Sequence, residues 1–173
     1  LCAPFKIKVN VVPHANQWSG GLFQKKQVKE MNIEELLERD EIILPNDFSN
    51  VNYENATILV TGAAGSIGSE ICRQLIGYNV KKLIILDQAE SGLFDLEYEL
   101  KQKGMRHPSQ AEVASVRDYM RIKKIFLAHQ PDIVFHVAAY KHVPLMECFS
   151  SEAVLTNIFG TKVIADLSML HSV

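Results

Sequence analysis

Three glycines, Gly62, Gly65 and Gly68, stand at intervals of three between a short apolar run and a helical pattern, in the stretch TGAAGSIG. The first turn of a helix leaves backbone N–H groups free and carries the positive end of the helix dipole, so a pyrophosphate is its natural ligand. In such a loop the first glycine permits the tight turn, the second lets the backbone approach the phosphates, and the third lets the helix lie close to the strand. The spacing predicts a dinucleotide-binding loop.

Two details qualify this loop. Ala64 stands where the common dinucleotide fingerprint has a glycine, so the loop is of a different type. Ser66 and Ile67 fill the second gap and can add N–H donors. A glycine-rich turn without a ligand is the alternative, because a glycine pattern by itself is a weak signal.

A second signal is Asp87, which ends the next predicted strand. A carboxylate at this point can accept hydrogen bonds from both ribose hydroxyls of an adenosine. No Lys or Arg follows in DQAES to receive a 2′-phosphate, so the sequence favours NAD over NADP. The alternative for Asp87 is a cap at the end of a strand.

The elements that must position these residues alternate in type along residues 51–173. Repeats of an apolar strand followed by an amphipathic helix predict an α/β fold, a doubly wound (Rossmann) parallel sheet with right-handed crossovers. The predicted strands are 57–61, 81–87, 111–116 and 132–139, and the predicted helices are 66–75, 89–104, 117–130 and 150–172. Helical spacing runs through Ile67, Ile71 and Leu75, through Leu93, Leu96 and Leu100, and through Tyr119, Ile122 and Phe126, with Tyr119 facing the core.

Residues 1–50 do not continue this alternation. A predicted strand at 6–12 and a predicted helix at 31–40 precede a linker that contains Pro45 and several asparagines, so we place a domain boundary near residue 50. The chain begins with Leu1 rather than Met, which suggests a piece of a longer protein.

Composition excludes several functional classes. A net charge of -2 provides no basic field for nucleic acid. The cysteines Cys2, Cys72 and Cys148 lack metal-ligand spacing and favour a reducing, cytoplasmic setting over a disulfide framework, so we predict no metal site. We see no signal peptide, and no window approaches the roughly 18 apolar residues of a membrane span.

Longer motifs add a resemblance to a known family. TGAAGSIG resembles the fingerprint of extended short-chain dehydrogenases/reductases, and AAYKHVPLME and TNIFGTK are similar to signatures of its polysaccharide-biosynthesis branch, the nucleotide-sugar 4,6-dehydratases and epimerases of capsule and flagellin-glycan type. The resemblance covers residues 57–173 strongly. Residues 1–50, with VKEMNIEELLERD, resemble the bridge of long members that are anchored at the cytoplasmic face of the inner membrane through upstream helices.

The resemblance implies roles for individual residues. Asp87 would hold the adenosine ribose, and Ala138 and Ala139 would let the nicotinamide-side ribose pass over the end of the fourth strand, with plain close packing as their alternative. The residues that would line the pyrophosphate are Gly62, Ala64, Gly65, Ser66, Ile67 and Gly68.

One residue departs from the family pattern. The family has an Asp-Val-Arg-Asp run after the third strand, where its first Asp reaches the adenine amine, whereas this chain has Ser115. A hydroxyl can still bond adenine, but the charge-assisted bond is lost. We expect Asp118 to cap the next helix.

Polar residues after the fourth strand are further candidates. Lys141 can meet a sugar-nucleotide phosphate or hold a loop, and His142 can do acid–base work or serve structure only. We expect His136 to be a satisfied core histidine. Asn157 lies among apolar residues and should bond backbone near the site, because an unpaired buried amide is costly.

The predicted function follows from what the chain has and lacks. The resemblance implies the NAD-binding part of a UDP-N-acetylglucosamine 4,6-dehydratase; the alternatives are an epimerase on the same scaffold or a non-catalytic nucleotide sensor. The family's Ser/Thr-Asp-Lys run is absent, and its Tyr-x-x-x-Lys spacing occurs only at Tyr78 and Lys82 and at Tyr119 and Lys123, in the wrong places. We therefore predict no catalytic residue in this chain and no turnover of a UDP-sugar by the chain alone. Exposed helices would allow a homo-oligomer.

Overall fold

The computed structural model describes residues 10–11, 29–30 and 52–173. Backbone contacts divide the chain into two compact units, residues 1–50 and 51–173. In the first unit, strands β1 (Asn10–Val11) and β2 (Lys29–Glu30) pair antiparallel. The predicted helix at 31–40 lies outside the described residues.

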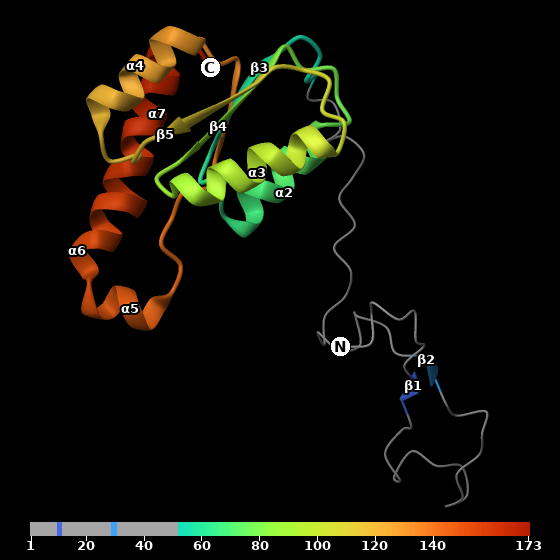
Figure 1. Ribbon diagram of the computed structural model, residues 1–173. Helices are drawn as coiled ribbons and strands as arrows, with labels where there is room; N and C mark the ends of the chain where they lie inside the picture. Colours follow the sequence, from blue (N-terminus) through green and yellow to red (C-terminus); the bar gives the residue numbers. More distant parts are fainter. Residues whose placement is uncertain (1–9, 12–28, 31–51) are drawn as a thin grey trace, which may run out of the picture. The chain divides into compact units, whose positions relative to one another are not determined.

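The second unit contains a four-stranded parallel sheet, which confirms the predicted α/β class (Figure 1). Its order is β5-β4-β3-β6, so the first strand of this unit lies in the interior of the sheet. Three consecutive residues at its centre, Ile58, Leu59 and Val60, have no exposed surface, as expected for a strand that is covered on both faces. The strands are β3 (Thr57–Thr61), β4 (Lys82–Asp87), β5 (Ser109–Val113) and β6 (Ile133–His136).

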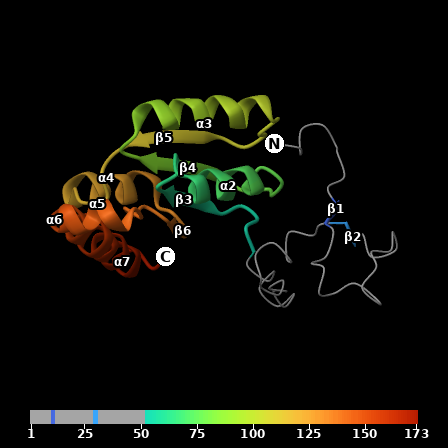
Figure 2. The same cartoon turned by 90° about the horizontal axis from the view of Figure 1, so that it is seen from below.

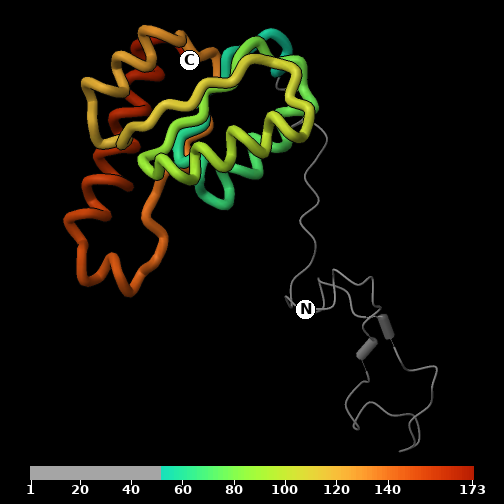
Figure 3. Tube along the Cα trace, in the orientation of Figure 1, coloured from blue at the N-terminus to red at the C-terminus, as the bar shows by residue number. Residues whose placement is uncertain are grey.

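Helices cover both faces of this sheet (Figure 2). Alternate strand residues point to opposite faces, so Ile58 and Val60 pack with α2 and α3, whereas Leu59 packs with α4 and α7. Figure 3 shows the C-terminal helix lying beside α4. The helices are α2 (Ser66–Leu75), α3 (Glu90–Gln102), α4 (Tyr119–His129), α5 (Val143–Cys148), α6 (Ser150–Ala153), the π-helical η6 (Val154–Gly160) and α7 (Thr161–Leu170).

Two predicted strands end earlier than their apolar runs. The third predicted strand, β5, ends at Val113, because its pairing with β4 extends only to that residue. The N–H of Ala114 then donates to the carbonyl of Asp87, 3.0 Å away. The fourth ends at His136, which pairs with Thr61, the last residue of β3. Residues 137–139 therefore form the open end of the sheet instead of more strand.

One predicted inward position is wrong. Tyr119 is 40% exposed, since it is the first residue of α4. Ile67 is 68% exposed in the first turn of α2, and the buried face of this helix carries Cys72 and Leu75. Helix α3 buries Leu93, Leu96 and Leu100 as predicted.

The stretch Ser150–Leu170 is a continuous helical segment of 21 residues. By length and composition alone it could cross a membrane, contrary to the expectation from sequence. Val163, Ile164 and Leu167 are buried in the same apolar cluster as β3 and β4 residues, which is the packing of a helix that covers a sheet.

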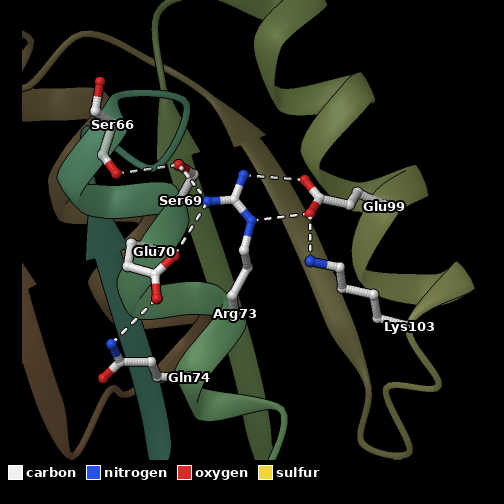
Figure 4. Close-up of polar contacts among 7 residues, drawn as sticks. All are labelled: Ser66, Ser69, Glu70, Arg73, Gln74, Glu99 and Lys103. Atoms are coloured by element: carbon white, nitrogen blue, oxygen red, sulfur yellow. Dashed lines mark hydrogen bonds and ion pairs between the residues drawn. The ribbon is translucent and has the colours of Figure 1, made fainter. Parts of the chain in front are cut away.

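A polar cluster fastens α2 to α3 (Figure 4). Arg73 forms a bidentate pair with Glu99, with Nε–Oε1 at 2.8 Å and Nη2–Oε2 at 3.0 Å, and Lys103 Nζ lies 2.8 Å from the same carboxylate. Arg73 Nη1 also donates to Ser69 Oγ at 3.2 Å, and Ser69 Oγ donates to the carbonyl of Ser66 at 3.3 Å. The cluster thus connects α3 to the first turn of α2.

This cluster predicts a pH dependence of stability. Hydrogen bonds from Arg73 and Lys103 lower the pKa of Glu99 from 4.5 to about 2. The stabilisation from Glu99 is complete above the unfolded pKa and is lost as pH falls towards 2. In urea titrations followed by circular dichroism, Glu99→Gln should lower the free energy of unfolding at pH 6 and lower it less at pH 3. Glu54→Gln, an exposed control, should give no such difference; an equal effect of Glu99→Gln at both pH values would contradict the prediction.

Candidate functional site

The loop between β3 and α2 is built around the backbone of Gly62. This residue has φ +67°, a left-handed conformation, and a Cβ there would lie 2.7 Å from the Cα of Ala138. A Cβ on Gly68 would lie 2.2 Å from the Gly62 carbonyl oxygen, which also accepts the N–H of Gly65 at 3.0 Å. A side chain at Gly62 would therefore separate the loop from the segment after β6, and one at Gly68 would separate the helix from the loop.

Helix α2 begins at Ser66 without a side-chain cap and without an acidic residue in its first turn. Within residues 52–173, the N–H groups of Ser66, Ile67 and Gly68 have no acceptor, and the first N–H that bonds back along the helix is that of Ser69, to Gly65. Three donors and the positive end of the dipole therefore meet at this point. The arrangement suits an anion.

A cavity opens beside this loop, at the carboxyl ends of β3, β4 and β6. It includes six of the predicted site residues: Gly62, Gly65, Asp87, Ser115, Ala138 and Ala139. The remaining lining residues are Leu86, Gln88, Ala114, Val116, Val137, Tyr140 and Thr156. Of the other predicted residues, Ala64, Ser66, Ile67 and Gly68 lie on the adjacent loop and first helical turn.

The carboxylate of Asp87 braces the edge of this cavity. One oxygen accepts the N–H of Ala64 and the other accepts the N–H of Ala89, each at 3.0 Å. Asp87 therefore does cap the end of its strand, and it also holds the glycine loop against β4. Each carboxylate oxygen can accept a further hydrogen bond, so the group can still bind hydroxyls.

The loop after β5, next to β4 in the sheet, also lines the cavity. Ser115 lines the cavity, and its Oγ accepts the N–H of Arg117 at 3.4 Å. Asp118 caps α4, as predicted, by accepting the N–H of Arg121 at 3.0 Å. Arg117 forms an ion pair with Glu152 of α6, which ties this loop to the C-terminal helices.

Polar contacts fix the segment that follows β6. Asn157 bonds backbone, as predicted: its Oδ1 accepts the N–H of Tyr140 and its Nδ2 donates to the Tyr140 carbonyl, both at 2.9 Å. His136 is half-buried and satisfied, with Nδ1 2.7 Å from Thr61 Oγ1 and Nε2 3.0 Å from Thr161 Oγ1, and burial lowers its pKa.

The two remaining candidates lie away from this cavity. Lys141 lines a neighbouring depression between α5 and η6, together with Tyr140, Met146 and Glu147. His142 is the exposed residue before α5 and lines neither hollow.

Comparison with known proteins agrees with this architecture. The family model described as polysaccharide biosynthesis protein matches residues 58–173. The chain belongs to this family. It is 35% identical over 166 residues to "Probable polysaccharide biosynthesis protein EpsC" of Bacillus subtilis and 36% identical over 167 residues to "Capsular polysaccharide biosynthesis protein CapD" of Staphylococcus aureus. These alignments cover 95% and 96% of this chain but only 28% of each relative.

A further relative and two solved structures give the same picture. The UDP-N-acetylglucosamine 4,6-dehydratase (inverting) of Campylobacter jejuni is 31% identical over 66% of this chain and 33% of its own. The structure of UDP-glucose 4-epimerase from Thermotoga maritima with UDP-glucose matches with a TM-score of 0.57 and 31% identity, over 68% of this chain and 35% of that one. The epimerase from Bifidobacterium longum with NAD+ and UDP gives 0.58 and 25%, over 68% and 34%. The predicted resemblance to extended short-chain dehydrogenases/reductases is confirmed.

Among the cavity residues that sequence reasoning missed, Thr156 has a distinct chemistry. Thr156 is 6% exposed, it lines the cavity, and its Oγ1 has no hydrogen-bond partner within residues 52–173. A buried hydroxyl without a partner is costly, and it marks a place where a ligand group can bind. The available signal was its position next to Asn157 in TNIFGT.

Other reactive groups are not brought to the cavity. Lys82 bonds Gln110 and His129 at the amino ends of the strands, so the spacing of Tyr78 and Lys82 has no counterpart at the site. Burial raises the pKa of Cys72 to about 12, which keeps this thiol protonated. Among the described residues, no group of three His, Cys, Asp or Glu side chains could hold a metal ion.

The glycine geometry gives a direct test of the loop. Gly68→Ala should lower the free energy of unfolding by about 1–3 kcal/mol, because its Cβ must displace the Gly62 carbonyl. Gly77→Ala is a matched control, since its Cβ would meet its nearest neighbour at 3.5 Å, an ordinary contact. Urea unfolding measures both; equal effects of the two substitutions would show that the close approach at Gly68 is not real.

Proposed function

We propose that residues 51–173 bind NAD as the cofactor-binding part of a UDP-N-acetylglucosamine 4,6-dehydratase that acts in the synthesis of capsular or surface polysaccharide. The observation that carries this proposal is the juxtaposition of the uncapped start of α2 with the Asp87 carboxylate beside one cavity. The N–H groups of Ser66, Ile67 and Gly68 match an anionic pyrophosphate, and the carboxylate matches neutral hydroxyls. The donors at the start of α2 and the acceptor at Asp87 thus match the pyrophosphate and the ribose of a dinucleotide, respectively.

The remaining lining fits the other parts of this cofactor. Small side chains at Ala138 and Ala139 leave room for a ribose to pass over the end of β6, and the hydroxyls of Ser115 and Thr156 can bond polar atoms of the dinucleotide. NAD, when bound, would accept a hydride from the sugar and return it within one turnover. This chain's own residues would hold and orient that cofactor.

The whole protein's activity is also a proposal. The match to a UDP-N-acetylglucosamine 4,6-dehydratase supports a UDP-sugar as substrate, and Lys141 and His142 are candidates for contact with it. The structural match to epimerases supports epimerisation on the same scaffold as the alternative. We propose that the isolated chain does not turn over a UDP-sugar.

Residues 1–50 we propose to be a bridge from an upstream domain. The alignments with EpsC and CapD cover 95% and 96% of this chain, whereas the alignment with the Campylobacter dehydratase covers 66%. This difference supports a long-type parent, which we propose is anchored at the membrane with this domain in the cytoplasm. Exposed apolar residues of α5, η6 and α7, such as Val143, Ile158 and Met169, support a homo-oligomer.

Calorimetric titration tests the cofactor proposal. The chain should bind NAD more tightly than NADP, because the Asp87 carboxylate accepts from ribose hydroxyls and repels a 2′-phosphate. Asp87→Asn should weaken NAD binding roughly 10- to 100-fold, as expected for a hydrogen bond to a charged group, and should reduce the preference for NAD. Lack of NAD binding by the unmodified chain would refute the proposal. An unchanged preference in the variant would refute the role of Asp87.

Thr156 allows a test that separates binding from folding. Thr156→Val removes a buried hydroxyl without a partner, so the free energy of unfolding should stay within about 1 kcal/mol of the original or rise. NAD affinity should fall two- to tenfold. The control Thr161→Val removes a hydroxyl that is bonded to His136 and lies outside the cavity, so it should lower stability and leave NAD affinity unchanged. If Thr156→Val instead lowered the free energy of unfolding and left NAD affinity unchanged, the Thr156 hydroxyl would serve only the stability of the fold.

A further inference from the structure

Two side chains meet across the cavity. Gln88 directly follows Asp87 at the end of β4, and Tyr140 follows Ala139 beyond the end of β6. Gln88 Nε2 donates a hydrogen bond to Tyr140 Oη at 3.3 Å, and both residues line the cavity. Strand β3 lies between β4 and β6, so this contact spans the end of the strand that leads into the glycine loop.

The two ends of this contact are held firmly, whereas the contact itself is weak. Asn157 fixes the backbone of Tyr140 through two hydrogen bonds of 2.9 Å. Gln88 stands between Asp87 and Ala89, which are bonded to each other at 3.0 Å. A single neutral hydrogen bond joins the side chains at an exposed position, and such a bond shifts an equilibrium by about two- to tenfold.

We propose that Gln88 and Tyr140 form a latch across the mouth of the cavity, and that the latch must open before a dinucleotide can enter or leave. The inference rests on the proposed function. A dinucleotide that reaches from Asp87 to Ala138 and Ala139 spans the same two strand ends as this contact, so it has to pass beneath or displace the contact on its way in. A latch that closes over both the empty and the filled cavity slows association and dissociation alike, and it changes the dissociation constant little.

Stopped-flow fluorescence with NADH measures both rates on the full chain. Association is followed on mixing with NADH, and dissociation is followed after a chase with excess NAD. Tyr140→Phe keeps the ring and removes the hydroxyl, so both rate constants should rise two- to tenfold while Kd stays within about twofold. Tyr98→Phe removes a hydroxyl from an exposed tyrosine of α3 outside the cavity and should leave both rates unchanged.

A double variant tests whether the two side chains act together. Gln88→Met also breaks the hydrogen bond, so the double variant with Tyr140→Phe should be no faster than either single variant. Multiplied effects would mean independent action and would overturn the latch. So would an unchanged dissociation rate in Tyr140→Phe, or a rise in dissociation alone, which is the result for a side chain that merely touches the ligand. These outcomes leave NAD binding intact; a chain that binds no NADH would refute the latch and the proposed function together.

Discussion

The packing around the backbone of Gly62 is the constraint on which the rest of the site depends. Its left-handed conformation turns the chain at the end of β3, its Cα lies against Ala138 at the end of β6, and its carbonyl lies under Gly68 of α2. These close approaches set where α2 begins. They therefore set where the three free N–H groups of its first turn lie relative to the carboxyl ends of the strands.

The second determinant of the site is the Asp87 carboxylate, which braces the glycine loop and can also accept hydrogen bonds from a ligand. Asp87 accepts the N–H groups of Ala64 and Ala89, so it holds the glycine loop to the neighbouring strand before any ligand arrives. Because this bracing fixes both oxygens, their remaining lone pairs have a defined direction, and a ligand need not order them. The same reasoning applies to Tyr140, whose backbone is fixed by Asn157. A site assembled from loop residues thus gains rigidity from polar contacts to its own backbone.

Sequence alone was sufficient for the parts of this structure that depend on local pattern. Apolar strands, the capping role of Asp118 and the inward leucines of α3 all follow from spacing and residue type. It failed where neighbours decide the outcome. Tyr119 fits an apolar helical spacing, yet it lies at a helix start and is 40% exposed. Thr156 and the contact between Gln88 and Tyr140 depend on packing between segments distant in sequence, which no spacing rule reports.

The π-helical segment η6 has a consequence for how this region can change in length. A π turn accommodates about one residue more than an α turn, so the segment shifts the facing of all later residues by roughly 100°. Thr156, near the start of η6, lines the cavity, and Val163, Ile164 and Leu167, which follow η6, are buried in the cluster with the sheet. Deleting one residue between Thr156 and Val163 would convert the π turn to an α turn. It would also rotate either the Thr156 hydroxyl away from the cavity or the apolar residues of α7 away from the sheet. The residue count of this segment is therefore constrained by the cavity on one side and by the sheet on the other.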